Sequence, residues 1–308
     1  MPADLRADEG APGAGVALSR DLQPVIEPQL ARLATGSGCR TLSDWSFANL
    51  YLFRAAHDCR YVPGSWPHIT GITYDGMPYV FPLFALEDAP QSVLHGLLRG
   101  GRCIFPLSDD QLARLDPHEF VATHSPDDSD YLYPASNFAH YRGKVLQKKG
   151  NLARQFLAAH RLEVQPCTPA LLPQVEVVLS GWLRDKGKSL GDADDLPCRE
   201  ALALAPELGL EALLFLADGK PAGVLIGQPL QPDVDVIRFA KSLARYKGLA
   251  QAMFQHYAVR RGPAVAWLNF EQDLGLANFR ATKRSYRPQA LLAKHRVTLR
   301  GAGARPGA

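Results

Sequence analysis

Apolar residues recur along the chain with the two spacings that distinguish strands from helices. In the second half, a series of three strands, one helix and one short buried strand is predicted at residues 212–217, 222–229, 234–239, 248–260 and 264–269. The turn Asp218-Gly219-Lys220 separates the first two strands. Two amphipathic helices are predicted ahead of this series, at 169–185 and 198–205.

The first half has a similar plan that is rich in short strands. Helices are predicted at 42–56, 92–98 and 109–115, and a basic helix at 141–160. Strands are predicted near residue 61 and at 69–74, 79–84, 102–106, 120–123 and 131–133. The turn Asp75-Gly76 marks a hairpin between two of these strands.

Helices and short strands are mixed in both halves, so the pattern predicts an α+β fold with mixed sheets. We expect one domain at 19–160 and a second at 161–300. The flanking segments 1–18 and 301–308 are rich in Ala, Gly and Pro and are expected to be disordered.

A basic loop precedes the helix predicted at 248–260. Its pattern is R-x-x-G-x-A, and its residues are Arg245, Lys247, Gly248, Leu249 and Ala250. Backbone N–H groups at a helix start are unpaired and lie at the positive end of the helix dipole, so they favour a phosphate. A glycine there lets an anion approach the backbone. The loop and the order of elements look like the GNAT acyltransferase core, whose loop holds the pyrophosphate of coenzyme A.

Polar residues follow the strand predicted at 264–269. Asn269, Glu271 and Asp273 lie at its carboxyl end, where α/β proteins often place ligand sites. Glu271 or Asp273 is a candidate general base or amine-binding group, and Asn269 could orient a substrate. The alternative is that both acids only cap the next helix. Tyr286, at the end of that helix, is either a catalytic acid or a core aromatic residue.

The densest basic stretch lies in the helix predicted at 141–160. Lys144, Lys148 and Lys149 are accompanied by Arg142 and Arg154, and Lys144 and Lys148 would share one helix face. Such a stretch is either a solvated surface or a patch for a phosphorylated ligand or a tRNA backbone.

Composition excludes several classes of protein. A net charge of +3 is too small to indicate a nucleic-acid binder by itself, and 46% hydrophobic residues suffice for a core. The five cysteines and nine histidines show no metal-ligand spacing. No stretch resembles a signal peptide or a transmembrane helix. We therefore expect a cytoplasmic protein, with peripheral membrane association as an alternative.

The chain also resembles a known family at positions between Trp45 and Pro288. These positions are Asp130, Tyr131, Tyr133, Gly143, Lys144, Lys148, Lys149, Asn151, Phe156, Trp182, Glu200, Ala201, Leu202, Lys241, Lys247, Gly248, the run from Asn269 to Gly275, Arg280, Lys283, Ser285, Tyr286 and Pro288. They are similar to the C-terminal domain of phosphatidylglycerol lysyltransferase (the DUF2156 group). The chain departs from that pattern at Gly150, where the family usually has arginine, and at Phe279, where an aliphatic residue is usual.

The resemblance implies two fused GNAT-like domains and a ligand groove between or beside them. Asp130, Tyr131 and the basic stretch would face the strand end at Asn269–Asp273. It also implies an acyltransferase (EC 2.3 type) that moves an aminoacyl group from aminoacyl-tRNA, or a related acyl group, to an amine or hydroxyl of a small-molecule or lipid-like acceptor, without a tightly bound cofactor. An N-acyltransferase that uses acyl-CoA and a non-catalytic binding protein are the alternatives.

Overall fold

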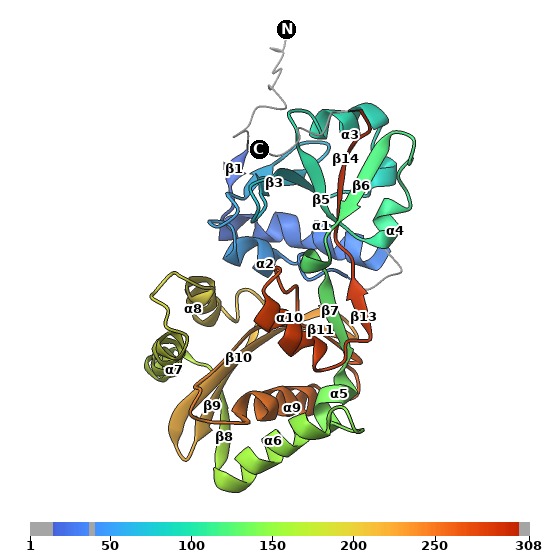
Figure 1. Cartoon of the computed structure of the whole chain (residues 1–308). Helices are drawn as coiled ribbons and strands as arrows, with labels where there is room; N and C mark the ends of the chain where they lie inside the picture. The colour runs from blue at the N-terminus through green and yellow to red at the C-terminus, as the bar shows by residue number, and fades with distance from the viewer. Residues whose placement is uncertain (1–14, 37–40, 302–308) are drawn as a thin grey trace. The chain divides into compact units, whose positions relative to one another are not determined.

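The computed structural model describes residues 15–36 and 41–301 (Figure 1). The chain forms two compact units. The first consists of Met1–Pro126 and Ala293–Ala308, and the second of Asp127–Leu292. Within the described ranges, no helix is both long and apolar enough to cross a membrane.

The sheet of the first unit has the strand order β1-β2-β3-β4-β5-β14-β6. Its strands are β1 Val16–Ala17, β2 Arg60–Val62, β3 His68–Ile72, β4 Pro78–Pro82, β5 Cys103–Leu107, β6 Phe120–His124 and β14 His295–Leu299. The helices of this unit are α1 Gln23–Gly36, α2 Phe47–Leu52, α3 Gln91–Leu97 and α4 Asp109–Leu112. β4 and β5 run parallel and the other pairs are antiparallel, so the sheet is mixed.

The sheet of the second unit has the order β13-β7-β12-β11-β10-β9-β8. Its strands are β7 Asp130–Pro134, β8 Leu162–Pro166, β9 Glu211–Ala217, β10 Lys220–Gln231, β11 Val234–Ser242, β12 Trp267–Asn269 and β13 Ala290–Leu292. Its helices are α5 Ala135–His140, α6 Gln147–Ala159, α7 Leu172–Asp185, α8 Asp195–Ala203, α9 Leu249–Arg261 and α10 Ala277–Arg284. Here β11 and β12 are the parallel pair. Two mixed sheets confirm the predicted α+β fold.

The division between the units differs from the predicted boundary at residue 160. β7 pairs with β12 and β13, and α5 and α6 pack against α9, so residues 127–160 belong to the second unit. Conversely, β14 from the end of the described chain lies between β5 and β6 of the first unit. These pairings join strands that are far apart in the sequence, and no local pattern reveals them.

Within the segments expected to be disordered, residues 15–18 differ from that expectation. Residues 1–14 and 302–308 lie outside the described residues. The described residues Val16 and Ala17 pair with Tyr61 and Arg60 of β2, and Leu18 is buried. Strand pairing and burial therefore order this short part of the segment 1–18, which composition alone does not indicate.

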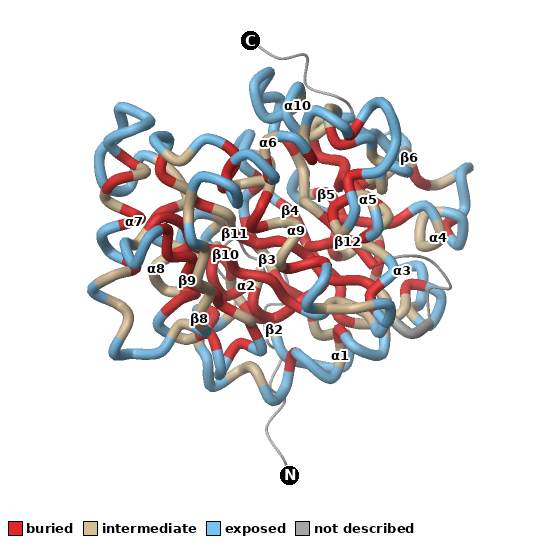
Figure 2. The backbone as a smooth tube through the Cα atoms, turned by 90° about the horizontal axis from the view of Figure 1, so that it is seen from below, coloured by how far each residue is buried: buried red, intermediate tan, exposed pale blue. Residues whose placement is uncertain are grey.

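Glycines bring the helices of the second unit close to its sheet. A Cβ atom on Gly227 of β10 would lie 2.2 Å from the Tyr257 hydroxyl of α9, so only glycine allows this approach. On the opposite face α7 packs against β10 and β11, and a Cβ atom on Gly181 would lie 2.5 Å from Leu243 Cδ2 (Figure 1). β10 and β11 are consequently buried along most of their length (Figure 2).

The basic helix predicted at 141–160 is interrupted in the structure. Tyr141 is buried and adopts a left-handed conformation with φ of 46°, which ends α5. α6 then begins only at Gln147. Lys144 therefore lies in the connecting loop and does not share a helix face with Lys148, contrary to the prediction.

Candidate functional site

The parallel strands β11 and β12 pair only over the beginning of β11. Val234–Val236 is in register with Trp267–Asn269, where β12 ends, and β11 continues beyond this point to Ser242. Arg238 lies in this continuing part, in a β-bulge, because Ile237 pairs with Gly227 and Phe239 pairs with Ile226. Bulges reorient side chains and are common next to active sites.

Arg238 connects β11 to the segment that follows β12. Its Nη1 donates a hydrogen bond of 2.6 Å to Oε1 of Glu271, and its Nε and Nη2 donate to Gln228 Oε1 at 3.1 and 2.9 Å. The Arg238 side chain is 0% exposed and that of Glu271 is 19% exposed. Burial raises the pKa of the Glu271 carboxyl, and Arg238 opposes this shift only in part. The Glu271 carboxylate therefore accepts a proton more readily than that of an ordinary glutamate.

The backbone around Glu271 is fixed by buried polar side chains. Glu271 has a φ of 56°, an uncommon conformation for a residue other than glycine. Its N–H donates to Asn269 Oδ1 at 2.7 Å, and Asn269 Nδ2 donates to Asp130 Oδ2 at 2.9 Å. Both Asn269 and Asp130 are 0% exposed. Asn269 and Asp130 therefore position Glu271 and are not free to contact a substrate.

Asp273 lies at the centre of a second buried network. Its carboxylate accepts hydrogen bonds from the Tyr131 hydroxyl at 2.6 Å, from Arg280 Nε and Nη2 at 3.0 Å each, and from the Gly275 N–H at 2.9 Å. Burial alone would raise the pKa of Asp273, but these donors outweigh it and lower the pKa to about 2. A carboxylate so stabilised is a weak base, so we assign Asp273 a structural role.

Lys283 stabilises the same loop from α10. Its ammonium group donates to the carbonyl oxygens of Phe270, Glu271 and Gln272. Arg280 also contacts Asp127, just before β7. Arg280 thus binds a carboxylate of the acidic segment, whereas Lys283 binds its backbone carbonyls and not its carboxylates.

Tyr286 lies in an aromatic cluster with Phe138, Phe254 and Tyr141. It is 4% exposed, and its hydroxyl accepts a hydrogen bond of 2.9 Å from Gln251. Burial raises its pKa to about 12. These observations favour the core role over that of a catalytic acid.

The basic stretch has one member that reaches this cluster. Lys149 Nζ lies 4.3 Å from the centre of the Tyr286 ring, and burial lowers the pKa of the amine. Lys144 and Lys148 are exposed. Gly150 is buried, and a Cβ atom there would lie 3.0 Å from Tyr141 Cβ, so a larger residue at this position requires Tyr141 to shift.

The glycine loop lies between α6 and α9. Gly248 has a φ of 93°, and a Cβ atom there would lie 2.2 Å from the Leu152 carbonyl oxygen of α6. The glycine is therefore required for helix packing, a constraint that the loop pattern does not indicate. No side chain among the described residues caps α9, which begins at Leu249 and continues through Ala250.

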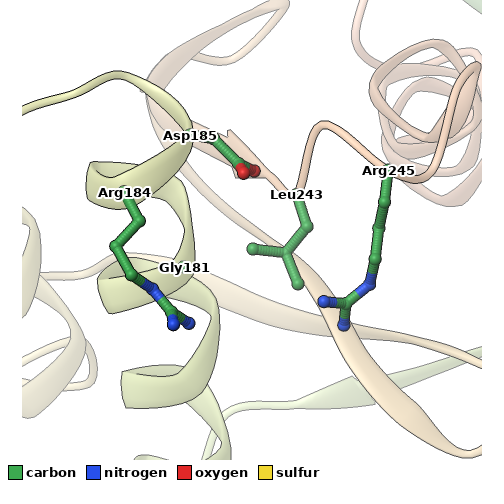
Figure 3. Close-up of a pocket in the computed structure, with 5 residues that line it drawn as sticks. All are labelled: Gly181, Arg184, Asp185, Leu243 and Arg245. Atoms are coloured by element: carbon green, nitrogen blue, oxygen red, sulfur yellow. The ribbon is translucent and has the colours of Figure 1, made fainter.

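A cavity of about 290 Å³ lies at the carboxyl end of β11, next to this loop (Figure 3). Its lining residues are Gly181, Arg184, Asp185, Leu243 and Arg245. Arg184 and Arg245 extend to the cavity from opposite sides, and the Asp185 carboxylate accepts the Ala244 N–H at 2.7 Å. Two guanidinium groups that reach one cavity are suited to a phosphate. Lys247 is exposed on the same loop.

Sequence reasoning missed Arg238, Gln228 and Arg184. Arg238 could have been found, because a charged residue inside the apolar run VDVIRFAKS must be paired when that strand is buried. Arg184 had no such signal. Among residues 15–36 and 41–301, no group of three or more His, Cys, Asp or Glu side chains is arranged to bind a metal ion. Cys39 lies outside these ranges.

The fold of the chain is similar to that of solved structures. A conserved protein of unknown function from Bacteroides thetaiotaomicron superposes with a TM-score of 0.78 at 21% identity, covering 92% of this chain and 98% of that one. L-PGS from Bacillus licheniformis superposes with a TM-score of 0.62 at 14% identity, covering 96% of each chain. None of the curated proteins matches the sequence.

The sequence also matches the family described as phosphatidylglycerol lysyltransferase, C-terminal, over residues 39–298. This range includes the Arg238–Glu271 pair, the loop with its cavity and most of both sheets. The chain therefore belongs to the phosphatidylglycerol lysyltransferase C-terminal family.

Proposed function

We propose that this protein transfers an aminoacyl or related acyl group to an amine or hydroxyl, with Glu271 as the general base. The observation that supports this role is the Glu271 carboxylate, which has a raised pKa and is bound by the buried Arg238 where β11 extends past β12. Attack on an ester or thioester carbonyl requires the nucleophile to lose a proton, and a carboxylate of raised pKa accepts it more readily.

The donor's phosphates would bind at the cavity formed by Arg184, Arg245 and the glycine loop. Arg238 and Leu243 are five residues apart on β11 and its continuation, which corresponds to about 17 Å. A suitable donor therefore carries its reacting carbonyl at that distance from a phosphate. The family and the likeness to L-PGS favour aminoacyl-tRNA, and the exposed Lys144 and Lys148 are candidate contacts for its backbone.

Acyl-CoA is the second candidate donor. The observation that favours it is the combination of the R-x-x-G-x-A loop with a cavity that holds two arginines, because a pyrophosphate needs both backbone donors and cations. In either case the acceptor is a small-molecule or lipid-like amine or hydroxyl, and no tightly bound cofactor takes part.

An experiment that compares the two candidate donors tests the proposal. The purified chain is incubated with amine and lipid acceptors and with either labelled aminoacyl-tRNA or labelled acetyl-CoA, and transfer of label to an acceptor is measured. Transfer that disappears after RNase treatment of the donor indicates the tRNA reaction, and thermal stabilisation by coenzyme A indicates the second candidate. If neither label transfer nor stabilisation by coenzyme A is observed, the proposed transfer reaction is contradicted, and a non-catalytic binding protein is the remaining alternative.

A further inference from the structure

Gln228 is a buried amide at the end of an apolar part of the sheet. It lies on β10, pairs with Val236 of the neighbouring strand β11 and is 6% exposed (Figure 1). Val224, Leu225 and Ile226, which precede it on β10, are each 0% exposed. A polar side chain in such surroundings lowers stability unless it forms hydrogen bonds. The role of Gln228 therefore depends on its partner.

That partner is one edge of the Arg238 guanidinium group. Gln228 Oε1 accepts hydrogen bonds from Nε at 3.1 Å and from Nη2 at 2.9 Å. These two donors lie on the same edge of a planar group, so one oxygen that binds both fixes the plane of the guanidinium. Nη1, away from that edge, donates to Glu271 Oε1 at 2.6 Å. Gln228 thus sets the direction of the donor that Glu271 receives.

The acceptor on this edge carries no charge, although the Arg238 side chain is 0% exposed. Buried arginines are ordinarily paired with carboxylates. The charged groups around the Glu271 carboxyl are Arg238 from β11, Asp130 from β7 and Lys283 from α10. A glutamate in place of Gln228 would orient Arg238 equally well, but it would add a second negative charge to that of Asp130. A glutamine orients the guanidinium without this effect.

We infer that Gln228 is a positioning residue, which aligns Arg238 with Glu271 while its neutral amide leaves the charge of Arg238 to act on the Glu271 carboxylate. The inference rests on the proposed function, in which Glu271 is the general base. Gln228 acts through Arg238 and not on the reacting atoms.

Two variants separate orientation from charge. Gln228→Met keeps the length of the side chain but removes the acceptor oxygen, so Arg238 is no longer aligned. We expect kcat to fall roughly tenfold to a hundredfold at every pH, with KM nearly unchanged.

Gln228→Glu keeps the oxygen and adds a charge. Two carboxylates then share one guanidinium, which raises the pKa of Glu271 further, so the base stays protonated to a higher pH. The acid limb of the kcat/KM profile should move up by about one pH unit or more. Above that pH, turnover should return to nearly the wild-type value, because Arg238 is still aligned.

The matched control is Gln255→Met. Gln255 is a half-buried glutamine of α9 whose side chain donates to the Ala139 carbonyl at 3.2 Å. This variant should keep the wild-type turnover and pH profile. Circular dichroism and urea unfolding check that each variant is folded. If Gln228→Met does not fold, the upward shift and the recovery of Gln228→Glu still test the inference.

A second readout does not require turnover. Carbon-13 NMR of the full chain, grown with carboxyl-labelled glutamate, follows the titration of Glu271, and the Glu271→Gln variant assigns its signal. The midpoint in Gln228→Glu should lie above that of the wild type. The inference is overturned if the two midpoints are equal, or if Gln228→Met has wild-type kcat. A shifted midpoint in a protein that transfers no label to any acceptor would support the positioning role of Gln228 and reject the proposed function.

Discussion

Two acids in one short segment have opposite electrostatic environments. The Glu271 carboxylate has a raised pKa beside one buried arginine, whereas Asp273 is held by several donors at a pKa of about 2. We therefore expect Glu271→Gln to lower turnover by about a hundredfold or more, because the general base is lost. Donor affinity, measured by calorimetry, should change little.

The matched control is Glu211→Gln, which removes another arginine-paired acid of the second unit, bound to Arg260. It should keep wild-type turnover. The raised pKa of Glu271 also predicts that the acid limb of the wild-type kcat/KM profile lies above the ordinary range of a glutamate, since activity is lost as this base is protonated. Unchanged activity of Glu271→Gln would exclude Glu271 as the base.

Asp273→Asn should affect stability more than chemistry. The folded state lowers the pKa of Asp273 from 3.8 to about 2, which corresponds to roughly 2 kcal/mol of stability. This contribution is complete above pH 4 and is lost as the pH falls toward 2, because protonation then weakens the bonds to Arg280 and Tyr131. Urea unfolding of both proteins from pH 6 to pH 2 should show a difference that shrinks in acid. If the difference in unfolding free energy between the two proteins stays constant over this pH range, the structural role of the Asp273 carboxylate is contradicted.

At the level of elements, the packing of α6 against the glycine loop sets the cost of replacing Gly248. Gly248→Ala should lower the free energy of unfolding by roughly 2–4 kcal/mol, since it combines a positive φ with a clash against the Leu152 carbonyl. Gly219→Ala is the control, because Gly219 has a φ of 73° and open space around its Cα. If chemical denaturation shows that both variants lose the same free energy of unfolding, the structure around residue 248 has moved to relieve the clash with the Leu152 carbonyl.

The end of α7 and the loop after β11 form the cavity together, so each should contribute to donor binding. Arg184→Gln and Arg245→Gln are each expected to weaken coenzyme A or aminoacyl-tRNA binding by about tenfold, as loss of a charge-assisted hydrogen bond does. Arg161→Gln removes an exposed arginine that does not line the cavity and should have little effect. Calorimetry at constant salt measures all three, and wild-type affinity in both cavity variants would contradict an anion site here.

At the scale of the whole molecule, the two units differ in the number of chain segments that form them. Asp127–Leu292 is one continuous segment, whereas the first unit needs Ala293–Ala308 to complete its sheet. We expect a fragment of residues 127–292 to unfold cooperatively on its own, and a fragment of residues 1–126 to lack a cooperative transition. Calorimetry of the two fragments tests this, and cooperative unfolding of 1–126 would show that β14 is dispensable.

The sequence predicts this protein well where structure is local. The strands and helix from β9 to β12 lie within a few residues of their predicted positions, because each has its own periodicity. Predictions fail where distant segments meet: β7 and β14 join sheets far from their neighbours in sequence, and β13 and β14 are too short or too polar to be recognised. At the site, Glu271 was identified from its place after a strand, but the buried partner Arg238 and the true constraint on Gly248 depend on tertiary packing.

The position of β14 between β5 and β6 has a consequence for biosynthesis. A ribosome completes residue 126 well before it reaches β14, and roughly 170 intervening residues take about 10–35 s at 5–20 residues per second. During this time β5 and β6 present unpaired edges, which are prone to join other chains. The nascent first unit therefore has to wait, protected or at risk of aggregation, for a strand that is made only after the entire second unit.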